Sequence, residues 1–115
     1  MYLLNWNPNE SKIEASFGGH VSVGEANVFA EELRELVVAA TDTSFVIVVD
    51  WSTASRMDQA VLDVLETARE TCLFAGSQKV TFVTRDETEA ANLTNRRLQQ
   101  VLEGREEYVA YGIAA

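Results

Sequence analysis

Few residues in this chain have the type and spacing that catalysis requires. Asp50 follows an apolar run and Asp58 comes eight residues later, with neither a His nor a Lys near them. Two such carboxylates make a poor acid–base pair. They do fall after a strand, where open parallel sheets bind ligands and partners. A structural explanation is also available, because Asp50 can end the strand and Asp58 can cap the next helix.

The other residues with chemical potential are isolated. His20 is the only histidine, which excludes a His-based zinc site or a Ser-His-Asp hydrolase built from this chain alone. Cys72 lies on the apolar stripe of a predicted helix, where burial raises the pKa of a thiol. Gly18 and Gly19 match neither nucleotide-binding glycine motif, and Asn92 heads a glycosylation triplet inside a predicted helix. We therefore expect no metal, no cofactor and no enzyme activity.

Composition favours one acidic domain over residues 1–115. Apolar residues make up 47% of the chain, and 9 basic against 18 acidic residues give a net charge of −9. A chain of this size can bury its own core. Nucleic-acid binding is not expected, because it needs clustered Lys and Arg. The lone cysteine, the lack of a signal-peptide pattern and the lack of a membrane-span pattern predict a cytoplasmic protein.

The N-terminal half predicts a hairpin followed by an amphipathic helix. Residues 2–6 and 12–17 are strand candidates separated by turn-forming residues. Ser22 and Glu25 have the spacing of a capping box, which marks a helix start. Apolar residues then recur at three- and four-residue steps from Ala26 to Ala40, so the helix packs one face.

The middle of the chain predicts a buried strand and a second helix. Residues 45–49 are uninterruptedly apolar, which is typical of a central parallel strand covered on both faces. We expect Asp50 to end this strand and residues 51–57 to form a polar connection. The helix begins with Asp58 as N-cap, or with Ser55 and Asp58 as a variant capping box, and ends before Gly76.

The C-terminal part predicts a strand over 79–84, a helix starting at Asp86 and closed by Gly104, and a last strand over 108–113. The expected order is β-β-α-β-α-β-α-β. Helices between successive strands favour parallel neighbours, which need long crossovers. The fold class is therefore α/β, with a mixed, mostly parallel β-sheet that opens on an N-terminal β-hairpin.

The segment after the apolar strand resembles the STAS family, the domains of sulfate transporters and bacterial anti-sigma factor antagonists. The family pattern is an apolar strand ending in Asp, a Ser, and an Asp eight residues after the first. Asp50, Ser52, Ser55, Met57 and Asp58 fall in register with it. The resemblance extends over roughly residues 13–101. It implies a STAS-like domain that regulates by binding a protein, such as an anti-sigma factor or an ATPase-fold serine kinase.

One departure concerns regulation. Gln59 stands where the family has the serine that the partner kinase phosphorylates, and an amide cannot accept phosphate in that way. We expect a module without the usual switch, although Ser52, Thr53 and Ser55 keep hydroxyls that a kinase could modify. The expected partner-binding residues are those of the loop and the helix start: Asp50, Ser52, Ser55, Met57, Asp58, Gln59 and Leu62.

There are three alternative functions, and the sequence disfavours two of them. The chain could be a STAS-like lipid or small-apolar-ligand binding component of a transport complex, and a pocket lined by Trp51, Met57 and Leu62 would favour that reading. A receiver domain is disfavoured, because its acidic pair after the first strand and its late Lys are absent. A small enzyme lacks a convergent acid, base and nucleophile.

Overall fold

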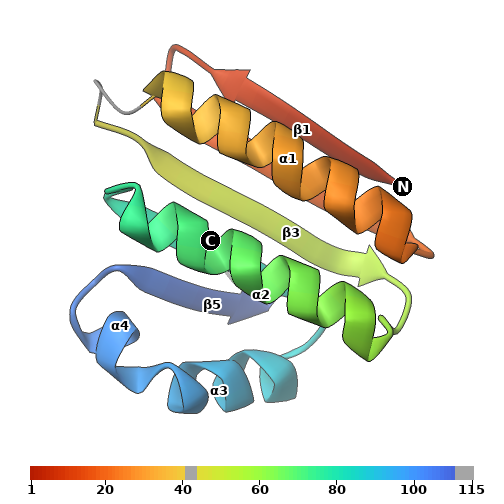
Figure 1. Ribbon diagram of the computed structural model, residues 1–115. Coiled ribbons are helices and arrows are strands. Elements are labelled where there is room, and N and C mark those ends of the chain that lie inside the picture. The colour runs from red at the N-terminus through yellow and green to blue at the C-terminus, as the bar shows by residue number, and fades with distance from the viewer. Residues whose placement is uncertain (41–43, 111–115) are drawn as a thin grey trace.

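The computed structural model describes residues 1–40 and 44–110. Within these ranges the chain forms five strands and four helices (Figure 1). The strands are β1 (Tyr2–Asn7), β2 (Lys12–Gly19), β3 (Val46–Ala54), β4 (Lys79–Thr84) and β5 (Glu106–Ala110). The helices are α1 (Val23–Ala40), α2 (Gln59–Phe74), α3 (Glu87–Arg96) and α4 (Leu98–Leu102). The protein is a small α/β domain.

The five strands form one mixed sheet in the order β1-β2-β3-β4-β5. β1 and β2 are an antiparallel hairpin, and the other neighbouring pairs are parallel. Each parallel connection runs through a helical crossover, as parallel pairing requires. The predicted hairpin and the mostly parallel sheet are therefore confirmed.

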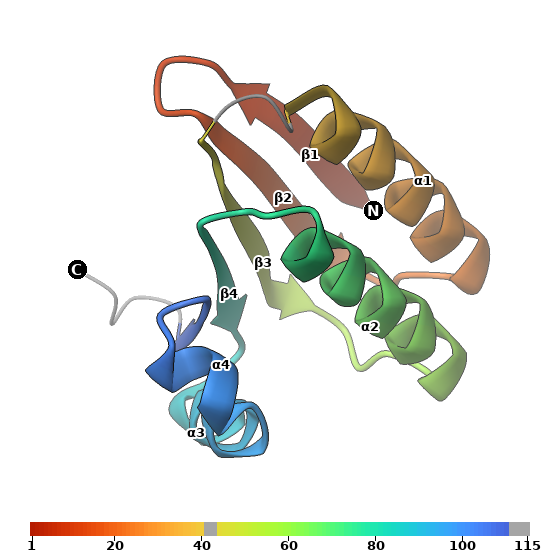
Figure 2. The ribbon, with the colours of Figure 1, turned by 60° about the vertical axis from the view of Figure 1, so that its left-hand side comes forward.

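The helices cover one face of the sheet. α1 and α2 lie side by side in front of it (Figures 1 and 2). In β2 the alternate residues Ile13, Ala15 and Phe17 are buried, while their neighbours are partly exposed. β3 follows the same alternation, so Val46 and Val48 face the open side. The prediction that this strand is covered on both faces was wrong, because every crossover returns over the same face.

Asp50 does not end β3, which continues to Ala54. The sequence becomes polar at Asp50, but the β3 backbone continues to pair with β2. After a register shift in β2 between Ser16 and Gly18, Thr53 pairs with Gly18 and Ala54 pairs with Gly19. The expected polar connection over 51–57 is thus half strand, and the loop before α2 shrinks to residues 55–58.

The helix boundaries largely follow the predicted signals. The Ser22 hydroxyl accepts the N–H of Glu25 at 3.1 Å, but the Glu25 carboxylate binds the amino group of Met1 instead of completing a capping box. Gly76 and Gly104 have positive φ angles of 84° and 76° after α2 and α4, a conformation that favours glycine.

The predicted third helix is two helices, α3 and α4. The chain leaves helical geometry at Arg97, with φ −116° and ψ 30°, and the Arg97 side chain is held by Glu66 of α2. The last strand starts at Glu106, two residues earlier than predicted, and pairs with β4 up to Ala110. Its predicted extension to Ile113 lies outside the described residues.

The core lies between the sheet and α1 and α2. Phe29 of α1 meets Phe17 at a ring-centroid distance of 4.7 Å and Tyr2 at 5.4 Å. Cys72 is buried as predicted, and burial raises the pKa of its thiol to about 12. Among the described helices, none combines the length and apolar character needed to cross a bilayer.

Candidate functional site

The loop before α2 is held from two sides. The backbone N–H of Ser55 donates to the Gly19 carbonyl at 2.8 Å. Arg85, which follows β4, donates from Nε to the Ala54 carbonyl at 3.0 Å and from Nη2 to the Ser55 carbonyl at 2.8 Å. These bonds fix where α2 starts, although the loop residues themselves remain largely exposed.

Asp58 occupies the N-cap position of α2, but its carboxylate accepts no capping hydrogen bond. The N-cap of α3 behaves differently, because Asp86 accepts the N–H of Glu89 at 2.8 Å. The exposed Asp58 carboxylate therefore lies at a helix N-terminus, where negative charge is favoured, without serving the helix as a cap. It is available to a partner.

Gln59 and Leu62 are also exposed at the start of α2. The Gln59 amide donates to Oδ1 of Asp63 at 2.9 Å, one turn further along. Leu62 is 44% exposed, one of several large apolar side chains that the helices of this protein leave in contact with water. Together with Ser55 and Asp58 these two residues form an exposed surface, which we name the α2-start surface.

Three of the predicted binding residues lie elsewhere. Oδ1 of Asp50 accepts the N–H of Ser52 at 2.8 Å and the hydroxyl of Ser52 at 2.6 Å. Asp50 pairs in register with Ser16 and Val83 in the row that faces away from the helices. Met57 is buried. The structure thus brings Ser55, Asp58, Gln59 and Leu62 together, and leaves Asp50 and Ser52 paired with each other on β3.

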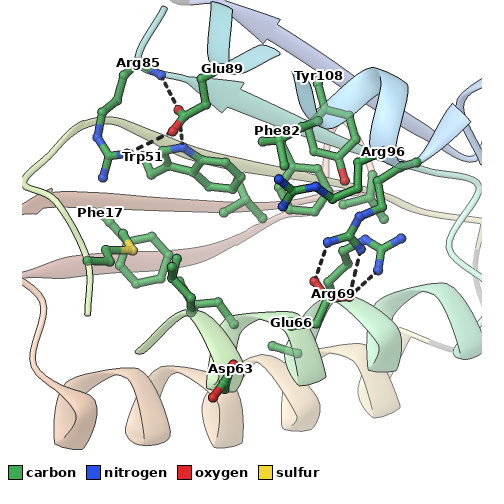
Figure 3. A pocket seen from close by; sticks show the side chains of 18 of the residues that line it. Phe17, Trp51, Asp63, Glu66, Arg69, Phe82, Arg85, Glu89, Arg96 and Tyr108 are labelled. Carbon is green, nitrogen blue, oxygen red and sulfur yellow. Dashed lines mark hydrogen bonds and ion pairs between the residues drawn. The ribbon is translucent and has the colours of Figure 1, made fainter. Parts of the chain in front are cut away.

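Beside this surface is a groove of about 1110 Å³, lined by residues of α2 and α3 and by Phe29 and Leu33 of α1. Trp51, Phe82 and Tyr108 line it from three neighbouring strands (Figure 3). Phe82 stacks on Tyr108 with ring centroids 5.0 Å apart, and Trp51 lies 5.3 Å from Phe82. Met57 and Leu62 belong to the same lining. A pocket lined by Trp51, Met57 and Leu62, which was expected only for the ligand-binding alternative, is therefore present.

An ion-pair network closes one end of the groove. Arg69 binds Glu66 (Figure 3) and also the fully buried Glu106. Arg97 binds both oxygens of Glu66 at 2.7 Å. The hydrogen bond from Arg97 lowers the pKa of Glu66. Burial, and then the charge of Glu106, raise the pKa of Tyr108 to about 12. The phenol of Tyr108 donates to Glu106 at 3.2 Å, so the network holds both α2 and α3 to β5.

A second network fixes the indole of Trp51. Oε1 of Glu89 accepts the indole N–H at 2.9 Å and the backbone N–H of Arg85 at 2.9 Å, and Nη1 of Arg85 binds the other carboxylate oxygen at 3.0 Å. This cluster was not predicted from the sequence. Its one local signal was the four-residue spacing of Arg85 and Glu89, which gives no indication of Trp51, 38 residues away.

The site combines hydrogen-bonding, charged and aromatic side chains. Among residues 1–40 and 44–110, no three His, Cys, Asp or Glu side chains gather closely enough to hold a metal ion. His20 is an exposed loop residue between β2 and α1. The arrangement supplies an exposed polar and apolar surface at the start of α2, next to an aromatic groove.

No protein-family model matches the chain, and no curated protein matches it.

Proposed function

We propose that the protein is a non-catalytic regulatory module, a single STAS-like domain over residues 1–115, that docks a protein partner through the α2-start surface. The observation that carries this proposal is the free carboxylate of Asp58, which occupies an N-cap position without capping. Exposed Leu62 beside it supplies the apolar contact that a protein interface needs. The segment 50–58 resembles the sequence pattern of anti-sigma factor antagonists, and this resemblance supports the same function.

An anti-sigma factor or an ATPase-fold serine kinase is the proposed partner, in the cytoplasm. Gln59 presents a neutral amide on this surface, bonded to Asp63. Phosphorylation of a serine there would add about −1.5 to −2 charges beside Asp58. Without that charge the surface stays in its binding-competent electrostatic state, so the proposed module is not switched at position 59.

Calorimetry with the anti-sigma factors and serine kinases of the same genome tests the proposal. Leu62→Asp should weaken binding of the partner by more than about tenfold, because it places a charge in the centre of the interface. Leu102→Asp is the matched control, since Leu102 is 77% exposed in α4. Equal affinities for both variants, or no binding partner among these proteins, would contradict the proposal.

A second function is favoured by the groove: binding of a lipid or small apolar ligand for a transport complex. The lining by Trp51, Met57 and Leu62, with Phe82 and Tyr108 beside them, gives a concave site with an apolar floor and charged residues around it. Ligand sites of this kind usually have volumes of about 300–1,000 Å³. Lipid that co-purifies with the protein and is identified by mass spectrometry would support this function.

A further inference from the structure

The basic residues of this acidic protein are concentrated at the groove. Five of its seven arginines line it. Three of them are already engaged: Arg69 and Arg97 with Glu66, and Arg85 with Glu89. Arg56 and Arg96 form no ion pair with any residue in the described part of the chain. The lining therefore contains two guanidinium groups that are not held by ion pairs within the described residues.

Of these two arginines, Arg96 is the one whose side chain is seen to point into the groove. It is the last residue of α3, and Figure 3 shows its guanidinium pointing from the helix into the cavity, over the region of Phe82 and Tyr108. Its aliphatic stem can lie along apolar groups while the guanidinium stays in contact with water. An anionic group that enters here meets a planar donor that no carboxylate of the described residues occupies.

Three aromatic rings and two leucines form part of the apolar lining of the groove. Phe82 and Tyr108 form one stacked pair, Trp51 continues the aromatic floor, and Leu62 and Leu65 line the α2 side. A chain of methylene groups laid along this floor removes apolar surface from water on both partners. A ligand with an apolar tail and a charged head matches this arrangement.

Charge further restricts the head group. Asp58, Asp63 and Asp86 also line the groove, and the whole protein carries a net charge of −9. A polyanion or an acidic peptide would meet repulsion from these groups, whereas one negative charge can be matched by Arg96 alone.

We propose that the groove binds a long-chain carboxylate, with its head on the Arg96 guanidinium and its tail along Phe82 and Trp51. This inference rests on the second proposed function, apolar-ligand binding, and names the chemical class of the ligand. It does not depend on docking of a protein at the α2-start surface.

Titration with dodecanoate and with dodecanol, both below their aggregation limits, separates the head from the tail. The protein has two tryptophans, so Trp6→Phe leaves Trp51 as the single indole reporter. Dodecanoate should change Trp51 fluorescence and bind about tenfold more tightly than dodecanol, because a charge-assisted hydrogen bond is worth roughly one order of magnitude. Calorimetry on the unmodified protein should give the same ratio.

Two arginine variants complete the test. Arg96→Gln should remove the preference for dodecanoate while leaving dodecanol binding unchanged. Arg34→Gln, on the exposed side of α1, should keep the preference. Arg96 is exposed, so circular dichroism should show both variants folded.

Equal binding of dodecanoate and dodecanol, or a preference that survives Arg96→Gln, would overturn the carboxylate assignment while leaving apolar-ligand binding intact. Failure of both probes to bind would overturn the inference and the second proposed function together.

Discussion

Helices α1 and α3 both lie against the sheet, but they are held there by different forces. α1 buries five apolar residues, with Phe29 in contact with Phe17 and Tyr2. α3 buries Ala90 and is held mainly by polar groups, Glu89 to Trp51 at one end and Arg97, just after the helix, to Glu66 at the other. The groove is lined by residues of α2 and α3, and its lining also includes Phe29 and Leu33 of α1. The groove is therefore bordered by one helix fixed by apolar contacts and one fixed by polar contacts.

The difference between the two helices should be largest in the cost of truncating an apolar side chain. Phe29→Ala, at 2% exposure, should lower the free energy of unfolding by about 3–5 kcal/mol. Leu93→Ala, in the partly buried face of α3, should cost about 1 kcal/mol, because its neighbourhood is already partly open to water. Urea denaturation measures both values. Similar losses would show that α3 is packed as tightly as α1.

Breaking the buried ion pair tests whether polar contacts hold the α3 side. Arg69→Met should cost about 3 kcal/mol, because it leaves the carboxylate of Glu106 buried without a cation. Arg34→Met is the matched control on α1, where both partners are exposed, and it should leave the free energy of unfolding almost unchanged. If Arg69→Met lowered the free energy of unfolding as little as the control does, the ion-pair network would not be what holds α3 in place.

The stabilising contribution of the Glu66–Arg97 ion pair should depend on pH. The hydrogen bond from Arg97 lowers the pKa of Glu66 below its ordinary 4.5. A carboxylate with a lowered pKa adds stability above its unfolded-state pKa, and this contribution is lost as the pH falls through the lowered value. The stability difference between the wild-type protein and Glu66→Gln should therefore be constant near neutral pH and shrink in acid. Urea titrations at several pH values measure it, and a difference that persists unchanged in acid would contradict the pairing.

The smallest expected effect on stability is at position 59. Gln59→Glu places a second carboxylate four residues before Asp63, a cost of a few tenths of a kcal/mol that the helix N-terminus partly offsets. Stability should change by less than about 1 kcal/mol, while partner affinity falls several-fold. Gln99→Glu is the matched control, because Gln99 has the same four-residue relation to Glu103. An unchanged affinity for Gln59→Glu would place position 59 outside the interface.

Sequence reasoning succeeded where the signal is local. The three- and four-residue spacing in α1 identified Phe29 and Leu33 as buried, and Gly76 marked the end of α2. The polar residues after Asp50 gave the wrong end for β3, because strand pairing with Gly18 and Gly19 is a tertiary contact that the polar segment itself does not encode.

The candidate site was only partly predictable for the same reason. Ser55, Asp58, Gln59 and Leu62 are neighbours in sequence, so a motif could identify them. Arg96 and Phe82 line the same groove because of where α3 lies, and the position of a helix is set by contacts between distant residues such as Arg97 and Glu66. No local pattern carries that information.

Hydrogen exchange on the protein alone and in complex with its partner tests the central claim most directly. The account predicts that, on binding, the amides over residues 59–66 exchange more slowly, while those of α1 keep their free-state rates, because the partner covers the start of α2. Slowed exchange confined to α1, or to β1 and β2 at the hairpin side of the sheet, with residues 59–66 unchanged, would contradict docking at the α2-start surface.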